Sequence, residues 1–257
     1  MHGTSLFQLD GNILLCAGID DISKCLKLEG GAWVEHSSLN KRRVWEMAVP
    51  TKTATFIFGG IRSRRTYEYL PKDSTTWLMG KTDIPGGFTV GCAIAVKSDQ
   101  EIWLIGGNRT ERILSFNVED HTFQELPSQL NVGRYGHSCA FTPNTNKVMI
   151  TGGHNQNEGY LDSTEILDTE DGSVTMASPM NSKRDYHGMG VVTINGEERL
   201  AVFGGSNGGF WLDSVELYNF QTEKWETVEI RLKIRRINFG FLSVKLIDVI
   251  SHLQIPM

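Results

Sequence analysis

The feature that most constrains this chain is a glycine pair that ends a short apolar run and recurs along the sequence. It stands clearest at Val148–Gly153 and is repeated at Thr55–Gly60, Ile102–Gly107 and Ala201–Gly205. A degenerate copy lies at Ile13–Gly18. The second glycines, at positions 18, 60, 107, 153 and 205, are 42, 47, 46 and 52 residues apart. A period of about 40–50 residues is typical of β-propellers and of helical arrays.

The residues between the glycine pairs favour the propeller. Each pair is followed by a strand-like run containing an aromatic or apolar residue, and a second bulky residue follows seven positions later. These couples are Leu26 and Trp33, Phe116 and Phe123, Leu167 and Val174, and Tyr218 and Trp225, while Tyr69 and Trp77 are eight apart. Polar turn formers lie between the members, and no unit has room for a helix of about ten residues. Each unit therefore predicts four short strands, which is one blade of an all-β propeller.

At this level of detail the repeats resemble kelch repeats. The resemblance rests on the glycine pair after an apolar strand, on the aromatic residue seven positions before a Trp, and on the Arg134-x-x-His137 and Arg184-x-x-His187 motifs. It covers nearly all of residues 1–230 and implies a kelch-type β-propeller of five recognisable four-stranded blades. Kelch propellers commonly have six blades, so the five blades could belong to a six-bladed ring, and an open arc of blades is the alternative architecture. Trp33, Trp77, Phe123 and Trp225 are expected to pack between blades.

Residues 231–257 depart from the repeat. Arg236–Val244 resembles the start of a further blade, but no glycine pair follows it. The segment is interpreted either as the start of a sixth repeat or as a divergent C-terminal tail. Because Met1 stands at the start of the first predicted strand, we expect the natural parent chain to be longer, at one end or both.

Composition and cysteine usage suggest a cytoplasmic protein without a membrane or nucleic-acid partner. The net charge is -5, and no segment has about 18 consecutive apolar residues. The chain does not begin with the basic and apolar blocks of a signal peptide. Its cysteines, Cys16, Cys25, Cys92 and Cys139, form no Cys-x-x-Cys pair. We expect them to be free, buried thiols in a reducing, cytoplasmic environment.

Enzymes with the kelch architecture offer the main alternative function. Kelch-type copper oxidases use two His, two Tyr and a Cys crosslinked to Tyr, and five residues stand at matching places in the fourth and fifth repeats: Tyr135, His137, Cys139, Tyr186 and His187. The Arg-x-x-His motif belongs to the repeat itself, however, and a structural hydrogen bond from each His explains it without metal. No serine–histidine–aspartate elbow, phosphate loop or His-Glu-x-x-His motif is present. We therefore predict no enzyme activity, no catalytic residue, no metal and no cofactor.

Charge is distributed unevenly between the two faces expected for the disc. The loops that enter each first strand and those that follow each glycine pair share one face, and with the tail they carry 15 of the 25 Lys and Arg but only 9 of the 30 Asp and Glu. A surface of one charge sign speeds the encounter with an oppositely charged partner. The sequence thus predicts a protein-interaction module, a substrate adaptor or scaffold, that binds a partner with an acidic or phosphorylated segment. The predicted partner-binding residues are Arg62, Arg109, Arg134, Tyr135, His154, Asn155, Arg184, Tyr186 and Asn207.

Overall fold

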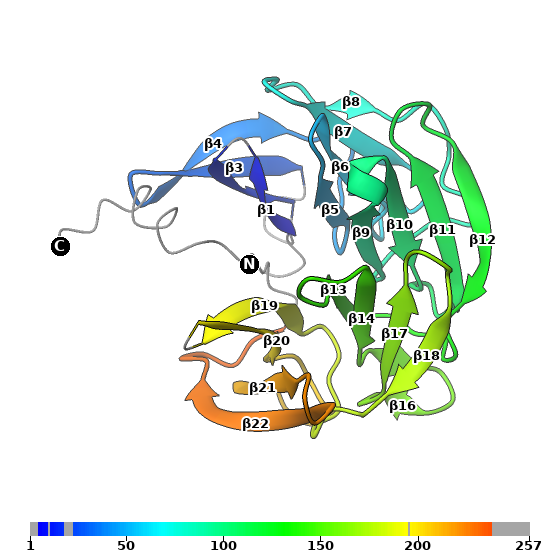
Figure 1. The fold of residues 1–257 in the computed structure, drawn as a ribbon. Coiled ribbons are helices and arrows are strands. Elements are labelled where there is room, and N and C mark those ends of the chain that lie inside the picture. The colour runs from blue at the N-terminus through cyan, green and yellow to red at the C-terminus, as the bar shows by residue number, and fades with distance from the viewer. Residues whose placement is uncertain (1–4, 10, 18–22, 195, 238–257) are drawn as a thin grey trace.

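Five four-stranded antiparallel sheets surround a central axis in a propeller arrangement (Figure 1). This computed structural model describes residues 5–9, 11–17, 23–194 and 196–237. Within those ranges the only helical element is a short 3-10 turn, η1 (Lys97–Asp99). The predicted all-β propeller of five four-stranded blades is confirmed.

The strands of each blade are neighbours in chain order. Blade one contains β1 (Ser5–Leu9), β2 (Asn12–Cys16), β3 (Lys24–Glu29) and β4 (Ala32–Ser38). Blade two contains β5 (Met47–Pro50), β6 (Ala54–Phe58), β7 (Tyr67–Pro71) and β8 (Leu78–Met79). Blade three contains β9 (Cys92–Val96), β10 (Glu101–Ile105), β11 (Arg112–Asn117) and β12 (Phe123–Gln129).

The last two blades follow the same plan with one addition. Blade four contains β13 (Ser138–Phe141), β14 (Lys147–Thr151), β17 (Thr164–Asp168) and β18 (Val174–Ala177). A small extra hairpin, β15 (His154–Asn155) and β16 (Gly159–Tyr160), stands between β14 and β17. Blade five contains β19 (Gly188–Ile194), β20 (Glu197–Phe203), β21 (Ser214–Asn219) and β22 (Lys224–Arg231).

The first strands of the blades meet around the axis. β1 contacts β5, β5 contacts β9, β9 contacts β13, and β13 contacts β19. All five strands line a central cavity of about 240 Å³. β13 is consequently only half-buried along its length, whereas the second strand β6 is buried throughout. The burial of second strands explains why they read as unbroken apolar runs.

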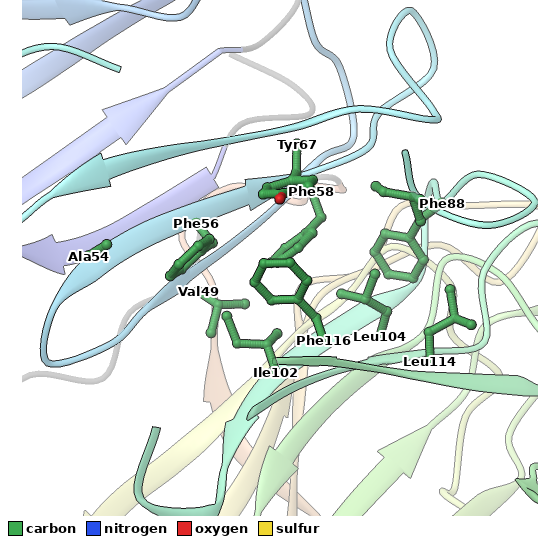
Figure 2. Packing of buried hydrophobic residues seen from close by; sticks show 11 residues of the cluster. Val49, Ala54, Phe56, Phe58, Tyr67, Phe88, Ile102, Leu104, Leu114 and Phe116 are labelled. Atoms are coloured by element: carbon green, nitrogen blue, oxygen red, sulfur yellow. The ribbon is translucent and has the colours of Figure 1, made fainter. Parts of the chain in front are cut away.

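Apolar packing between successive blades forms the core. Figure 2 shows one cluster, in which Phe56 and Phe58 of blade two meet Phe116 of blade three. The Phe56 and Phe116 ring centroids are 5.4 Å apart and the rings meet edge to face. Burying each such side chain stabilises the fold by about 1.5–3 kcal/mol. A blade therefore gains much of its stability from its neighbours.

The bulky residue that starts each outer strand packs against the preceding blade. Trp77 of blade two and Trp225 of blade five are buried in this way, and Phe123 of blade three packs, half-buried, against blade two. Trp33 of blade one is instead 41% exposed, so its predicted role in inter-blade packing is wrong for the described structure. No blade precedes blade one among the described residues, and Trp33 therefore lacks the neighbour that covers its counterparts. The strand register also pairs it with Leu28 and not with Leu26.

The glycine pairs end the second strands where the next blade crosses them. Gly152 and Gly153 have φ values of 59° and 95°, in the region that a side chain disfavours. The Gly153 amide donates to the Arg184 carbonyl of blade five at 2.7 Å. A Cβ atom on Gly152 would overlap the Arg184 carbonyl oxygen of blade five. Glycine is therefore required both for the turn and for the close approach of the next blade.

The cysteines differ from the prediction. The structure joins Cys16 to Cys25 between β2 and β3, and Cys92 to Cys139 between the inner strands of blades three and four. The expectation of four free thiols is therefore wrong here, because strand pairing and blade packing bring cysteines together that are 9 and 47 residues apart in sequence. No helix within the described ranges is long and apolar enough to cross a membrane.

The sixth-repeat prediction falls mostly on residues 238–257, which lie outside the described residues. The described part ends just after Arg236, whose carbonyl accepts a 3.0 Å hydrogen bond from Gly205. Arg184 accepts the corresponding bond from Gly153 one repeat earlier.

Candidate partner-binding face

Two of the predicted binding residues, Arg134 and Arg184, have fully buried side chains. Arg134 Nη2 lies 2.6 Å from Glu165 Oε1, and Arg184 Nη2 lies 2.8 Å from Glu216 Oε1. Each guanidinium also donates, at 2.7 Å, to the carbonyl of the first glycine of its blade's pair. Neither guanidinium faces solvent, as a partner-binding side chain would need to do. They instead tie the turn before the first strand to the rest of their own blade.

A third copy of this ion pair lies in blade two. Arg43 Nε lies 3.1 Å from Glu68 Oε1, both side chains are buried, and Arg43 Nη1 donates to the Gly59 carbonyl at 2.6 Å. Burial lowers the pKa of Arg43, while the charge of Glu68 acts in the opposite direction. The Glu68 carboxylate also accepts the backbone amides of Asn40 and Lys41 at 2.5 and 2.9 Å. These bonds satisfy a charge that would otherwise be costly to bury.

The sequence carried a signal for this network that the analysis of single residues missed. An Asn stands three residues before each of the three arginines, at Asn40, Asn131 and Asn181, and a Glu lies inside each third strand, at Glu68, Glu165 and Glu216. The backbone N–H of each Asn donates to the glutamate of its own blade, as that of Asn131 does to Glu165 at 2.6 Å. A repeated Asn-x-x-Arg with a distant Glu thus indicates a buried structural pair.

The two histidines of the repeat motif are structural as well. His137 Nε2 lies 3.1 Å from the Ile105 carbonyl, and His187 Nε2 lies 2.8 Å from Thr151 Oγ1. Burial, helped by the nearby Arg134 charge, lowers the pKa of His137 to about 3. Each histidine thus lies within hydrogen-bonding distance of one protein oxygen, as the structural interpretation of the motif expects.

The cysteine that a kelch-type copper oxidase would crosslink to a tyrosine has another partner in this structure. Cys139 is joined to Cys92 and not to a tyrosine. No group of three or more His, Cys, Asp or Glu in the described ranges is arranged to hold a metal ion.

The turns that precede the first strands form a rim of backbone hydrogen bonds at the mouth of the central cavity, which the next residues, Gly91, His137 and His187, line. Trp45, Val90, Gly136 and Tyr186 occupy the same position in blades two to five, and all have positive φ values, of 61°, 56°, 66° and 50°. The Val90 amide donates to the Trp45 carbonyl, Gly136 to Val90, and Tyr186 to Gly136, at 3.4, 2.6 and 2.7 Å. Each blade thereby fixes the turn of the next one.

Aromatic side chains gather on this rim. The Tyr135 ring lies 5.1 Å from His154 and 6.4 Å from Tyr186, between centroids, and the Arg109 guanidinium lies 5.4 Å from its centre. Tyr186 in turn lies 5.7 Å from Trp45. We call Trp45, Arg109, Tyr135, His154 and Tyr186 the mouth cluster. Four of these residues were predicted from the sequence, and Trp45 was not.

The mouth cluster carries one fixed charge. Arg109 is exposed and its guanidinium lies over the half-buried Tyr135. Burial, together with the Arg109 charge, lowers the pKa of His154, which is therefore neutral at neutral pH. Burial also raises the pKa of Tyr186, so its hydroxyl stays protonated. The cluster thus offers aromatic faces and one cation, a combination suited to apolar and anionic side chains.

The remaining predicted residues divide between loop structure and open surface. The Asn155 amide donates to the Gly133 carbonyl at 2.6 Å, and its oxygen accepts the backbone amides of residues 157 and 158. Asn207 accepts the amides of residues 209 and 210 in the same manner. Both asparagines therefore shape their loops. Arg62 is exposed in the loop after β6 and is not part of the mouth cluster.

The comparisons with known proteins agree with this architecture. The family model "KLHDC2/KLHL20/DRC7 Kelch-repeats domain" matches residues 91–240. The F-box/kelch-repeat protein SKIP20 of Arabidopsis thaliana is 32% identical over 166 residues, which cover 60% of this chain and 39% of that protein. The chain thus aligns with well under half of the length of this relative. Repeated glycine pairs, five four-stranded blades and a family model that matches more than half of the residues together show that the chain belongs to the kelch-repeat family.

Proposed function

We propose that this chain is a non-catalytic protein-interaction module whose partner binds on the loop face at the channel mouth. The observation that carries the proposal is the mouth cluster, where Arg109 meets aromatic rings from several turns and loops. The rim hydrogen bonds hold the backbone of these turns in place. A surface that is already ordered loses little conformational entropy when a partner binds.

An acidic or phosphorylated partner segment fits the charge of this face. Arg109 can donate to a carboxylate or phosphate while its guanidinium remains over Tyr135. Such a charge-assisted bond contributes about 1.5–3 kcal/mol when it is shielded from water. The interaction should weaken with salt, because Arg109 is exposed.

A role as substrate adaptor or scaffold follows from the kelch resemblance, and the F-box/kelch-repeat relative supports it. Kelch-type oxidase activity is the competing function. Elemental analysis of the purified protein separates the two, since stoichiometric copper or iron would contradict a non-catalytic module.

The cellular location is linked to the cysteines. Thiols fit the cytoplasmic location that the sequence predicts, whereas persistent disulfides fit an oxidising compartment. Alkylation of the protein in intact cells, followed by mass spectrometry, shows which pairs are oxidised. We propose a cytoplasmic location, in which both pairs that the structure joins would be reduced. Full oxidation of both pairs in the cell would contradict it.

Selection from a random dodecapeptide library tests the binding site. We expect the wild-type protein to enrich peptides that contain Asp or Glu together with an apolar or aromatic residue. Arg109→Glu should abolish the enrichment, whereas Lys224→Glu on exposed β22 is the matched control and should preserve it. Equal selection by the two variants would show that the partner binds elsewhere, and no enrichment by the wild type would contradict a peptide-binding face.

A further inference from the structure

A second basic surface lies beside the mouth cluster on blade two. It consists of the exposed side chains of two loops, and we call it the blade-two patch: Lys41, Arg42, Arg62, Arg64 and Arg65. The two loops touch, because Ser63 Oγ donates to the Arg42 carbonyl at 3.1 Å and the Ile61 amide donates to the Val44 carbonyl at 2.9 Å.

The buried ion pair of blade two holds these loops in place. Arg43, next to Arg42 in sequence, donates to the Gly59 and Thr66 carbonyls at 2.6 and 2.8 Å, at the two ends of the loop that carries Arg62, Arg64 and Arg65. The backbone of the patch is therefore fixed before any ligand arrives, which lowers the entropic cost of binding.

The charge of the patch is not balanced by the acids around it. Glu68 is buried and committed to Arg43, and Glu46 is buried as well. Asp83 is an exposed acid beside the patch, since the amide of the next residue donates to the Arg65 carbonyl at 2.8 Å. Among the described residues, none of the five patch side chains forms an ion pair. Arginines without internal partners are suited to paired hydrogen bonds with phosphate or carboxylate oxygens.

The patch and the mouth cluster form one surface with unlike ends. Trp45 follows the patch after two residues and its ring lies 5.7 Å from Tyr186 of blade five. The far end, over blades four and five, is aromatic, with Tyr160 4.9 Å from His154 and the Phe210 side chain 69% exposed. The blade-two end is thus cationic, and the other end is mainly aromatic, with Arg109 as the cation of the mouth cluster.

We propose that this polarity gives the partner a fixed direction: an extended protein segment places its anionic residues on the blade-two patch and its aromatic or apolar residue on the mouth cluster. This inference rests on the proposed function and adds the order of side chains in the partner. Paired contact at two separated points fixes register as well as affinity.

The same dodecapeptide selection tests the inference with different variants. With Arg62→Glu/Arg64→Glu/Arg65→Glu as bait, we expect enriched peptides to contain fewer Asp and Glu, because only Arg109 still attracts them, and to keep an aromatic or apolar residue. The matched control reverses three exposed lysines of the opposite turns, Lys52→Glu/Lys147→Glu/Lys224→Glu, and carries the same change in net charge. It should select the wild-type peptides. The unfolding midpoint of both variants should remain that of the wild type.

Individual peptides then measure the effect. For a selected peptide, the patch variant should bind at least tenfold more weakly, with a smaller dependence on salt, and the control should bind within about twofold of the wild type. A peptide with its acidic and apolar halves exchanged should bind at least tenfold more weakly than the original. Replacing the acidic residues by phosphoserine should preserve or strengthen binding by the wild type.

The outcomes separate this inference from the proposed function. If Arg109→Glu weakens binding and the patch variant does not, the directional inference is wrong and the module remains. If patch and control variants weaken binding equally, only net charge matters and the inference is wrong. If single-stranded RNA homopolymers bind the patch more tightly than selected peptides do, the patch serves a different class of ligand. If the wild type selects no peptide, both proposals fail.

Discussion

Blades three and four solve the same structural problem with opposite chemistry. In blade four Arg134 joins the turn before β13 to Glu165 of β17 through a buried ion pair. At the same two positions blade three has Phe88 and Leu114, which are 2% and 3% exposed and belong to one apolar cluster (Figure 2). Arg134 and Phe88 occupy corresponding positions, because the Gly107 amide donates to the Arg134 carbonyl as the Gly60 amide donates to the Phe88 carbonyl.

The difference shows that the fold requires a well-filled site and does not require the charge. Replacing a buried ion pair by packed apolar residues is often neutral or stabilising, whereas removing one partner leaves a buried charge without compensation. Blade three differs at all three positions, since Pro85 stands where blades two, four and five have an Asn three residues before the arginine. The pair is therefore a unit.

Breaking the unit in blade four should have the largest effect. Arg134→Ala leaves Glu165 buried and unpaired and should lower the free energy of unfolding by about 3–5 kcal/mol. Urea denaturation followed by tryptophan fluorescence measures it. Arg109→Ala, an exposed arginine of the same face, is the control and should change stability by no more than about 0.5 kcal/mol. Equal, small effects of the two variants would show that the buried pair does not hold the blade.

A buried acid at the rim should make stability depend on pH. Glu46 occupies the position of His137 and His187, is 2% exposed, and has two carboxylate oxygens without a hydrogen-bond partner among the described residues. Burial raises its pKa from 4.5 to about 7. The folded protein therefore binds more protons than the unfolded chain between these values, and stability falls as the pH rises through this window.

Glu46→Gln removes this titration. Between pH 5 and pH 8 the wild type should lose about 2–3 kcal/mol of stability relative to Glu46→Gln. Denaturation series at both pH values give the difference, in which the contribution of Asp185, whose pKa burial also raises to about 7, cancels. Parallel pH profiles of the two proteins would mean that Glu46 is already paired or ionised in the folded state.

Placing the apolar residues of blade three at the same positions of blade four should lower the free energy of unfolding the least. Arg134→Phe/Glu165→Leu removes both charges together and should destabilise the protein by about 2 kcal/mol, less than Arg134→Ala alone. The remaining cost comes from the Gly152 and Ser163 carbonyls, which lose the guanidinium that they share. A double variant less stable than Arg134→Ala would show that blade four cannot accept an apolar pair.

Much of the fold was predictable because the repeat is local. The glycine pairs, the apolar second strands and the couples Phe116–Phe123 and Tyr218–Trp225 gave the blades their number, order and register. Trp33 shows the limit of this reasoning: its blade has no preceding neighbour among the described residues, which a sequence pattern does not reveal. The cysteine pairs show the same limit, since Cys92 and Cys139 meet only across two blades.

The candidate site was predictable only in part. The sequence by itself selected Arg109, Tyr135, His154 and Tyr186, because their loops must share one face of the disc. It could not separate them from Arg134 and Arg184, since an arginine in a face loop reads the same whether its side chain points to solvent or to a glutamate some 30 residues later. That direction is decided by tertiary structure, where a buried carboxylate and the carbonyls of a glycine turn compete with water for the guanidinium.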